Sequence, residues 1–126
     1  MLANFRDYLK SLDVADNYYL GKMVNETEKS LGVYSQPGFR RPEAIGLRGS
    51  YDIAGFTLLL HWNKNAKESE AAARDLYEKI RYITDLDMGT LHVDYLDLLE
   101  AEPSFIGTDG NGVYEFSIPG RIYYRR

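Results

Sequence analysis

The sequence predicts an α+β fold: a mixed or antiparallel sheet of about four to six strands, one main helix packed on it, and a short N-terminal helix. Two patterns support this prediction. Apolar residues recur at helical spacing in residues 2–12 and 66–83, and side chains of alternating parity are apolar in residues 56–62 and 114–124. The length of 126 residues, with 44% hydrophobic residues, fits a single domain spanning 1–126 with one core.

The N-terminal segment is expected to form an amphipathic helix, because Leu2, Phe5, Leu9 and Leu12 fall on one face. A helix this short is marginal in isolation, so it should pack on an apolar surface. The next segments, NYYLGKM and SLGVYS, are rich in strand-forming residues and flank the polar VNETEK. They predict a hairpin from about residue 17 to residue 35.

Residues of about 36–51 are predicted to form a flexible arm. The stretch QPGFRRPEAIGLRGS contains two prolines and three glycines, a density that interrupts regular structure. Arg40, Arg41 and Arg48 outnumber Glu43, so the stretch is locally positive, and Phe39 adds an apolar side chain. Two interpretations remain open: a solvated loop, or an arm that becomes ordered against an acidic partner surface.

The segment YDIAGFTLLLHW predicts a strand that is apolar on both faces apart from Thr57 and His61. Such a strand is expected either to be central in the sheet, or to have one face covered by helices and the other by a neighbouring subunit. Asn65 is expected to cap the following helix, with Glu68 reaching back to it in a capping box. The helix should run to about residue 83 and bury an apolar stripe. This stripe consists of Ala73, Leu76, Tyr77, Ile80 and Ile83.

The polar stretch TDLDMGT is expected to be a linker to the C-terminal strands. The apolar parity after it shifts from Leu91 and Val93 to Leu96, which indicates a bulge near Tyr95. TDGNG, residues 108–112, is predicted to be a hairpin turn before the last strand. Pro119 interrupts that strand and should lie at a sheet edge or at a kink, because proline cannot donate in a ladder.

No set of residues predicts catalysis, so the chain is expected not to be an enzyme and to carry no cofactor. TDGNG leads into a strand and not into a helix, as a phosphate-binding loop would, and its spacing does not fit a calcium loop. His61 and His92 lie on different predicted strands without a second ligand at short spacing, so no metal site is expected. Paired carboxylates such as Asp85 with Asp87 are expected to be solvated.

The overall composition limits the classes of partner. Cysteine is absent, so disulfides, thiolate metal sites and cysteine nucleophiles are excluded. The net charge of −4 argues against general binding of nucleic acid through its phosphates. No apolar run approaches the length of a membrane span, so a soluble protein made in the cytoplasm is expected.

Three stretches taken together carry a resemblance to a known family: LGVYSQPG, the helix NAKESEAAARDLYEKI, and EPSFIGTDGNGVYEFSIPGRIYY. In this order, over roughly residues 17–124, the chain resembles the minor capsid and tail terminator proteins of long-tailed bacteriophages, including those carried as prophages. It departs from the family pattern at Trp62, where a basic residue is expected.

The resemblance implies a structural protein of the virion, synthesised in the cytoplasm of a bacterial host. In this family such a protein forms a ring of six subunits at the head-proximal end of the tail. The ring stops tail elongation and provides the head–tail joining surface. Its implied partners are further copies of itself, the tail tube protein and the head-completion protein, with no membrane and with DNA only as passing cargo.

Two groups of residues are predicted to form the ring contacts. One is Phe39, Arg40 and Arg41 in the arm, and the other is Tyr123, Tyr124 and Arg125 at the C-terminal end. Two alternatives remain open for the function. The chain could be a tail-tube or head–tail connector subunit, or, in a different class, a small ligand-binding or regulatory domain of the host.

Overall fold

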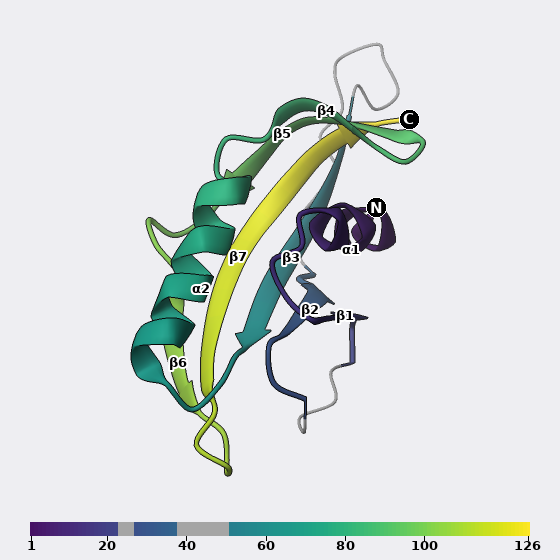
Figure 1. The fold of residues 1–126 in the computed structure, drawn as a ribbon. Coiled ribbons are helices and arrows are strands. Elements are labelled where there is room, and N and C mark those ends of the chain that lie inside the picture. Colours follow the sequence, from purple (N-terminus) through teal and green to yellow (C-terminus); the bar gives the residue numbers. More distant parts are fainter. Residues whose placement is uncertain (23–26, 38–50) are drawn as a thin grey trace.

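The computed structural model describes residues 1–22, 27–37 and 51–126. Within these ranges the chain forms two helices and a seven-stranded mixed sheet in the order β1-β2-β3-β7-β5-β4, with β6 also paired to β7 (Figure 1). The α+β prediction is confirmed, although the predicted number of strands is slightly low. The elements are α1 (Leu2–Ser11), β1 (Asn17–Leu20), β2 (Ser30–Ser35), β3 (Asp52–His61), α2 (Ala66–Ile80), β4 (Thr84–Met88), β5 (Leu91–Leu98), β6 (Ser104–Thr108) and β7 (Tyr114–Arg125).

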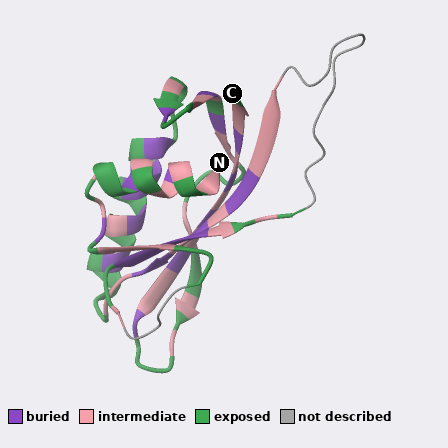
Figure 2. Cartoon of the chain, turned by 90° about the vertical axis from the view of Figure 1, so that its right-hand side faces the viewer, coloured by how far each residue is buried: buried purple, intermediate pink, exposed green. Residues whose placement is uncertain are grey.

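The helices α1 and α2 lie on the same face of the sheet and enclose the core with it (Figure 2). Phe5 and Leu9 of α1 are fully buried, and Phe5 packs against Phe56 of β3 with the ring centroids 4.8 Å apart. The even-numbered side chains of the two central strands point into this core. They are Phe56, Leu58 and Leu60 on β3, and Phe116, Ile118 and Ile122 on β7.

The cap of α2 is only partly the predicted capping box. The Asn65 side chain accepts a hydrogen bond from the Glu68 amide at 3.1 Å, as expected. The Glu68 carboxylate does not return to Asn65 but accepts from the Asn63 side-chain amide at 2.9 Å, and Asn63 Oδ1 accepts from the Asn65 amide. Asn63 therefore takes the place that the capping box gives to Glu68.

The end of α2 also differs from the prediction. The helix ends at Ile80, before the predicted Ile83, although both side chains are buried. The Ile83 carbonyl accepts a hydrogen bond from the Leu96 amide of β5, so the chain joins the sheet at this point. Because Ile83 is apolar and lies three residues after Ile80, the helical pattern in the sequence extends beyond the true end of the helix.

The predicted hairpin over residues 17–35 is wrong in its direction. The strands β1 and β2 exist, but they pair in parallel, with Tyr18 opposite Leu31 and Leu20 opposite Val33. The Lys29 carbonyl accepts hydrogen bonds from the Asp16 and Asn17 amides, so the residue before β2 lies beside the start of β1. From there β2 runs in the same direction as β1. Strand-forming composition predicts that a strand exists, but it does not predict the direction in which it pairs.

The predicted linker TDLDMGT forms a strand and a turn. Residues 84–88 are β4, antiparallel to β5, and Met88 is its only buried residue in the described structure. The Asn4 side chain of α1 donates a hydrogen bond to the Met88 carbonyl at 2.8 Å, which ties the helix to this edge strand. An edge strand with one buried side chain carries almost no apolar signal, which is why its composition resembled a linker.

Pro119 lies inside the sheet and not at an edge, because β7 is paired on both sides. Along one side of β7 the neighbour changes from β6, which ends its pairing at Ser117, to β5, which begins at Gly120. The Pro119 carbonyl accepts from the Leu99 amide, so the proline nitrogen faces this gap between β5 and β6. The amide hydrogen that proline lacks would therefore face a place where no strand is available to accept it.

The predicted bulge near Tyr95 is confirmed, since the register of β5 on β7 shifts between Val93 and Tyr95.

The predicted arm and its contact residues Phe39, Arg40 and Arg41 lie outside the described residues, apart from the flanking residues 36, 37 and 51. The Gln36 amide donates to the Gly55 carbonyl, and Ser35 pairs with Phe56. The residues on both sides of the segment 38–50 are therefore attached to the same end of the sheet.

In the part of the chain that the structure covers, no helix is long and apolar enough to cross a membrane.

Candidate functional site

The predicted contact residues at the C-terminal end do not form one surface. Tyr123 stacks on Tyr95, with the ring centroids 4.3 Å apart and the planes 10° apart. Tyr124 packs against the core on the opposite face, as consecutive residues of a strand must. Arg125 is exposed and pairs with Asp94 at 2.8 Å. The alternation of the strand places Tyr123 and Arg125 on the face that α1 and α2 leave uncovered, and Tyr124 on the covered face.

This uncovered face of the sheet consists of the odd-numbered side chains of β3 and β7. Most of them are half-buried, although Gly55 and His61 of β3 are buried. The apolar and aromatic members are Ile53, Leu59, Pro119 and Tyr123, with Thr57 and Ser117 between them. In an antiparallel sheet with a single packed face the outer face is usually polar, so aliphatic and aromatic side chains here are a candidate contact surface.

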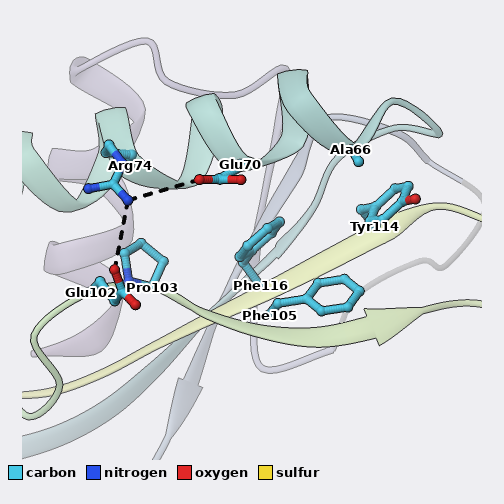
Figure 3. A pocket seen from close by; sticks show the side chains of 8 residues that line it. All are labelled: Ala66, Glu70, Arg74, Glu102, Pro103, Phe105, Tyr114 and Phe116. Carbon is cyan, nitrogen blue, oxygen red and sulfur yellow. Dashed lines mark ion pairs between the residues drawn. The ribbon is translucent and has the colours of Figure 1, made fainter.

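A second candidate surface is a groove between the N-terminal half of α2 and the strands β6 and β7 (Figure 3). It has a volume of about 390 Å³, and three aromatic rings line it, from Phe105, Tyr114 and Phe116. The Phe105 ring lies 5.5 Å from that of Phe116 and 5.7 Å from that of Tyr114. Ala66 at the start of α2 and Pro103 before β6 complete its apolar part.

Phe105 is 55% exposed although it belongs to this aromatic cluster, and its neighbour Ile106 is 54% exposed. Both lie on β6, which pairs with β7 on one side and has no described strand on the other. An exposed edge strand with apolar side chains on it is a site where another chain can bind. Phe105 is therefore shared by the groove and this exposed edge.

The rim of the groove is charged. Arg74 of α2 lies between two carboxylates, with its Nη2 atom 4.0 Å from Glu70 Oε1 and 3.8 Å from Glu102 Oε2 (Figure 3). Ion pairs of this length at an exposed surface contribute little to stability. With the two carboxylates of Glu70 and Glu102 around one guanidinium, the rim has a net negative charge.

The TDGNG turn confirms the predicted hairpin, and it also holds a buried histidine. The turn joins β6 to β7, with hydrogen bonds in both directions between Asp109 and Val113. Asp109 Oδ2 lies 2.7 Å from Nε2 of His61, and Nδ1 of His61 lies 2.9 Å from the Thr27 carbonyl oxygen. His61 is only 1% exposed. Its two partners are the Thr27 carbonyl oxygen and the Asp109 carboxylate, so both ring nitrogens are held by the protein.

The buried pair has an electrostatic consequence for the carboxylate. The hydrogen bond from His61, followed by those from the Val113 and Asn111 amides, lowers the pKa of Asp109 to about 2. Asp109 is thus ionised at all ordinary pH values. The His61–Asp109 pair fastens the turn to the end of β3 and to the segment before β2, which is a structural role.

The second histidine forms an exposed cluster at the other end of the sheet. His92 Nδ1 lies 2.7 Å from Asp87 Oδ1, and His92 Nε2 lies 2.8 Å from Asp85 Oδ1. The hydrogen bond with Asp87, followed by the charge of Asp85, raises the pKa of His92. The two aspartates predicted to be merely solvated therefore hold a histidine across β4 and β5.

Neither histidine cluster forms a metal centre. Among the described residues, no group of three or more histidine, aspartate or glutamate side chains is arranged to hold a metal ion.

The sequence analysis did not predict the groove, although a signal for it exists. Once TDGNG is a hairpin turn, the pairing of the strands places Phe105 opposite Phe116, and two facing aromatics beside an amphipathic helix predict an apolar surface.

Comparison with models of known protein families finds no match, and no curated protein matches the sequence.

Proposed function

We propose that this chain is a structural subunit that assembles as a ring on the head-proximal end of a phage tail, stops tail elongation and offers the surface to which the head joins. The sequence resemblance suggested this role. It requires surfaces that repeat by symmetry and no reaction centre.

The observation that carries the proposal is the uneven covering of the sheet. The helices α1 and α2 cover one face, while the other presents Ile53, Leu59 and the stacked pair Tyr95 and Tyr123. A second apolar surface, the groove with Phe105, lies at the sheet edge. A subunit in a closed ring has two neighbours and needs two different contact surfaces. The two candidate surfaces meet this requirement.

The polar clusters are consistent with a structural protein. The His61–Asp109 pair connects a turn to two neighbouring segments, and His92 connects β4 to β5. In each cluster the carboxylates contact the histidine and join segments that are distant in the sequence.

Deletion of the gene from an inducible phage tests this function directly. The proposal predicts that induced cells contain DNA-filled heads separate from tails, and that tail lengths vary widely. Complementation with the intact gene should restore joined particles with uniform tails. Normal particles from the deletion strain would contradict the proposal, and tubes of the pure protein would favour the tail-tube alternative.

A further inference from the structure

We propose that the groove between α2 and β6 binds residues 39–41 of a second copy of this chain, with Phe39 on the aromatic rings and Arg40 and Arg41 against the carboxylates of the rim. The inference rests on the proposed ring function and identifies the contact between neighbouring subunits. It concerns one occupant, the same protein.

The lining of the groove is apolar and suits an aromatic side chain. Phe105, Tyr114 and Phe116 form an aromatic surface, and more than half of the Phe105 side chain is exposed. Aromatic rings gain about 0.5–1.5 kcal/mol from pairing with another ring, beyond the gain from buried area. Phe39 is the only aromatic residue in the sequence between residues 35 and 50, and it is next to two arginines. Phe39 is therefore the side chain of this segment that can pack on the aromatic rings of the groove.

The charges of the groove and the segment are also complementary. Glu70 and Glu102 outnumber Arg74 at the rim, so the groove attracts a cationic segment. Arg40 and Arg41 provide adjacent guanidinium groups in a chain that is acidic overall. Guanidinium groups bind carboxylates in a forked geometry, which fixes orientation as well as adding energy.

Chain length indicates that the partner segment belongs to another copy. The Gln36 amide donates to the Gly55 carbonyl, whereas the groove residue Phe116 pairs with Leu60. Gly55 and Leu60 are about 17 Å apart along β3, and β6 is three strand spacings, about 14 Å, from β2. Residue 39 is two residues beyond Pro37, and two residues span at most about 7 Å. This length is too short to bring Phe39 to the groove of its own copy.

The consequence is a head-to-tail contact. Gln36 and Asp52, on either side of the segment, lie at one end of the sheet, and the groove lies towards the other end, so the two halves of the contact are different surfaces. Such heterologous contacts close into a ring when the rotation between subunits allows it. A symmetric dimer, by contrast, would place the same surface on both sides.

The test uses two charge-reversed proteins and their mixture. The arm variant carries Arg40→Glu and Arg41→Glu, and the groove variant carries Glu70→Lys and Glu102→Lys. A control carries Asp75→Lys and Glu78→Lys, which make the same change of charge at exposed positions of α2 outside the groove. Light scattering after size exclusion measures the mass of each, and circular dichroism verifies that each is folded.

We expect the wild type and the control to assemble to the same mass, and each variant alone to remain monomeric. An equal mixture should recover assembly, because intact segments meet intact grooves and the reversed segment and reversed groove carry complementary charges. With Phe105→Ser in place of the groove variant, the mixture should stop at twice the 14.5 kDa subunit mass, because it contains one intact segment and one intact groove. Variants that assemble like the wild type, a mixture that stays monomeric, or a wild type that is monomeric at every concentration would overturn the inference.

The outcomes separate this inference from the proposed function. If the variants behave as expected but phage lacking the gene make normal particles, the contact is right and the tail function is wrong. If the deletion phage fails to join heads and tails but the variants assemble and restore joining, the function stands and the ring uses another surface.

Discussion

Gly120 of β7 provides a sharp test of the packing described for the core. A Cβ atom at this position would lie 2.5 Å from Phe56 Cζ and 2.9 Å from the Asp97 carbonyl oxygen. Ordinary carbon contacts are about 3.5–4.0 Å, so the ring of Phe56 or the backbone of β5 would have to move by about 1 Å. Phe56 is completely buried and packs against Phe5, so it has no open space to enter.

We therefore expect Gly120→Ala to destabilise the protein. Overpacking costs about 1–3 kcal/mol, while the loss of glycine's freedom in the unfolded chain returns about 0.4–1 kcal/mol. The free energy of unfolding should fall by about 1–2 kcal/mol, which lowers the urea midpoint by roughly 0.5–1 M at a slope of about 2 kcal/mol/M. Fluorescence of the single tryptophan, Trp62, can follow the transition.

Two further variants make this result specific. Gly110→Ala is the matched control, because a Cβ there meets nothing within 4 Å. Its free energy of unfolding should stay within about 0.5 kcal/mol of that of the wild type. Phe56→Leu shortens the ring that the new methyl group meets, so it should reduce the cost of Gly120→Ala by about 1 kcal/mol in a double-mutant cycle. Equal stability of Gly120→Ala and the wild type would refute the described contact between β7 and Phe56.

Three other predictions follow from individual side chains. Asp109 has a lowered pKa of about 2, so its contribution to stability is complete above its unfolded value and disappears as the pH falls towards 2; Asp109→Asn should flatten urea midpoints between about pH 4 and pH 2. His92 has a raised pKa, so its contribution is complete below the unfolded value near 6.5 and disappears as the pH rises through the folded value; its NMR titration should shift upward, and Asp87→Asn should reverse that shift. Asn65→Ala removes the cap of α2 and should cost about 1 kcal/mol, whereas Asn65→Asp should retain most of the stability in the same assay.

The sequence predicted the elements whose apolar pattern is long and regular. The stripe of α2 and the alternation of β3 and β7 are clear because each of these elements buries one face along its whole length. The central position of β3 followed from apolar residues on both faces, and it is confirmed between β2 and β7. The direction of β1 could not be predicted, because four residues with one exposed end contain no information on the strand's orientation.

The site was less accessible from sequence, because it depends on residues that are distant in the chain. Thr27, His61 and Asp109 meet only after β3 and the β6–β7 turn are placed at one end of the sheet. The groove likewise joins α2 to β6, which are separated by β4 and β5. Local patterns predicted the TDGNG turn correctly, but its role as a clamp on a buried histidine required the tertiary structure.

The central claim is that the chain caps a tail tube by assembling at one end of it. Electron microscopy of tails isolated from the deletion phage and incubated with the purified protein tests this most directly. The account predicts added density at one end of each tube, tubes that no longer extend, and the ability to join heads. Binding along the whole length of the tubes, or no binding at all, would contradict it.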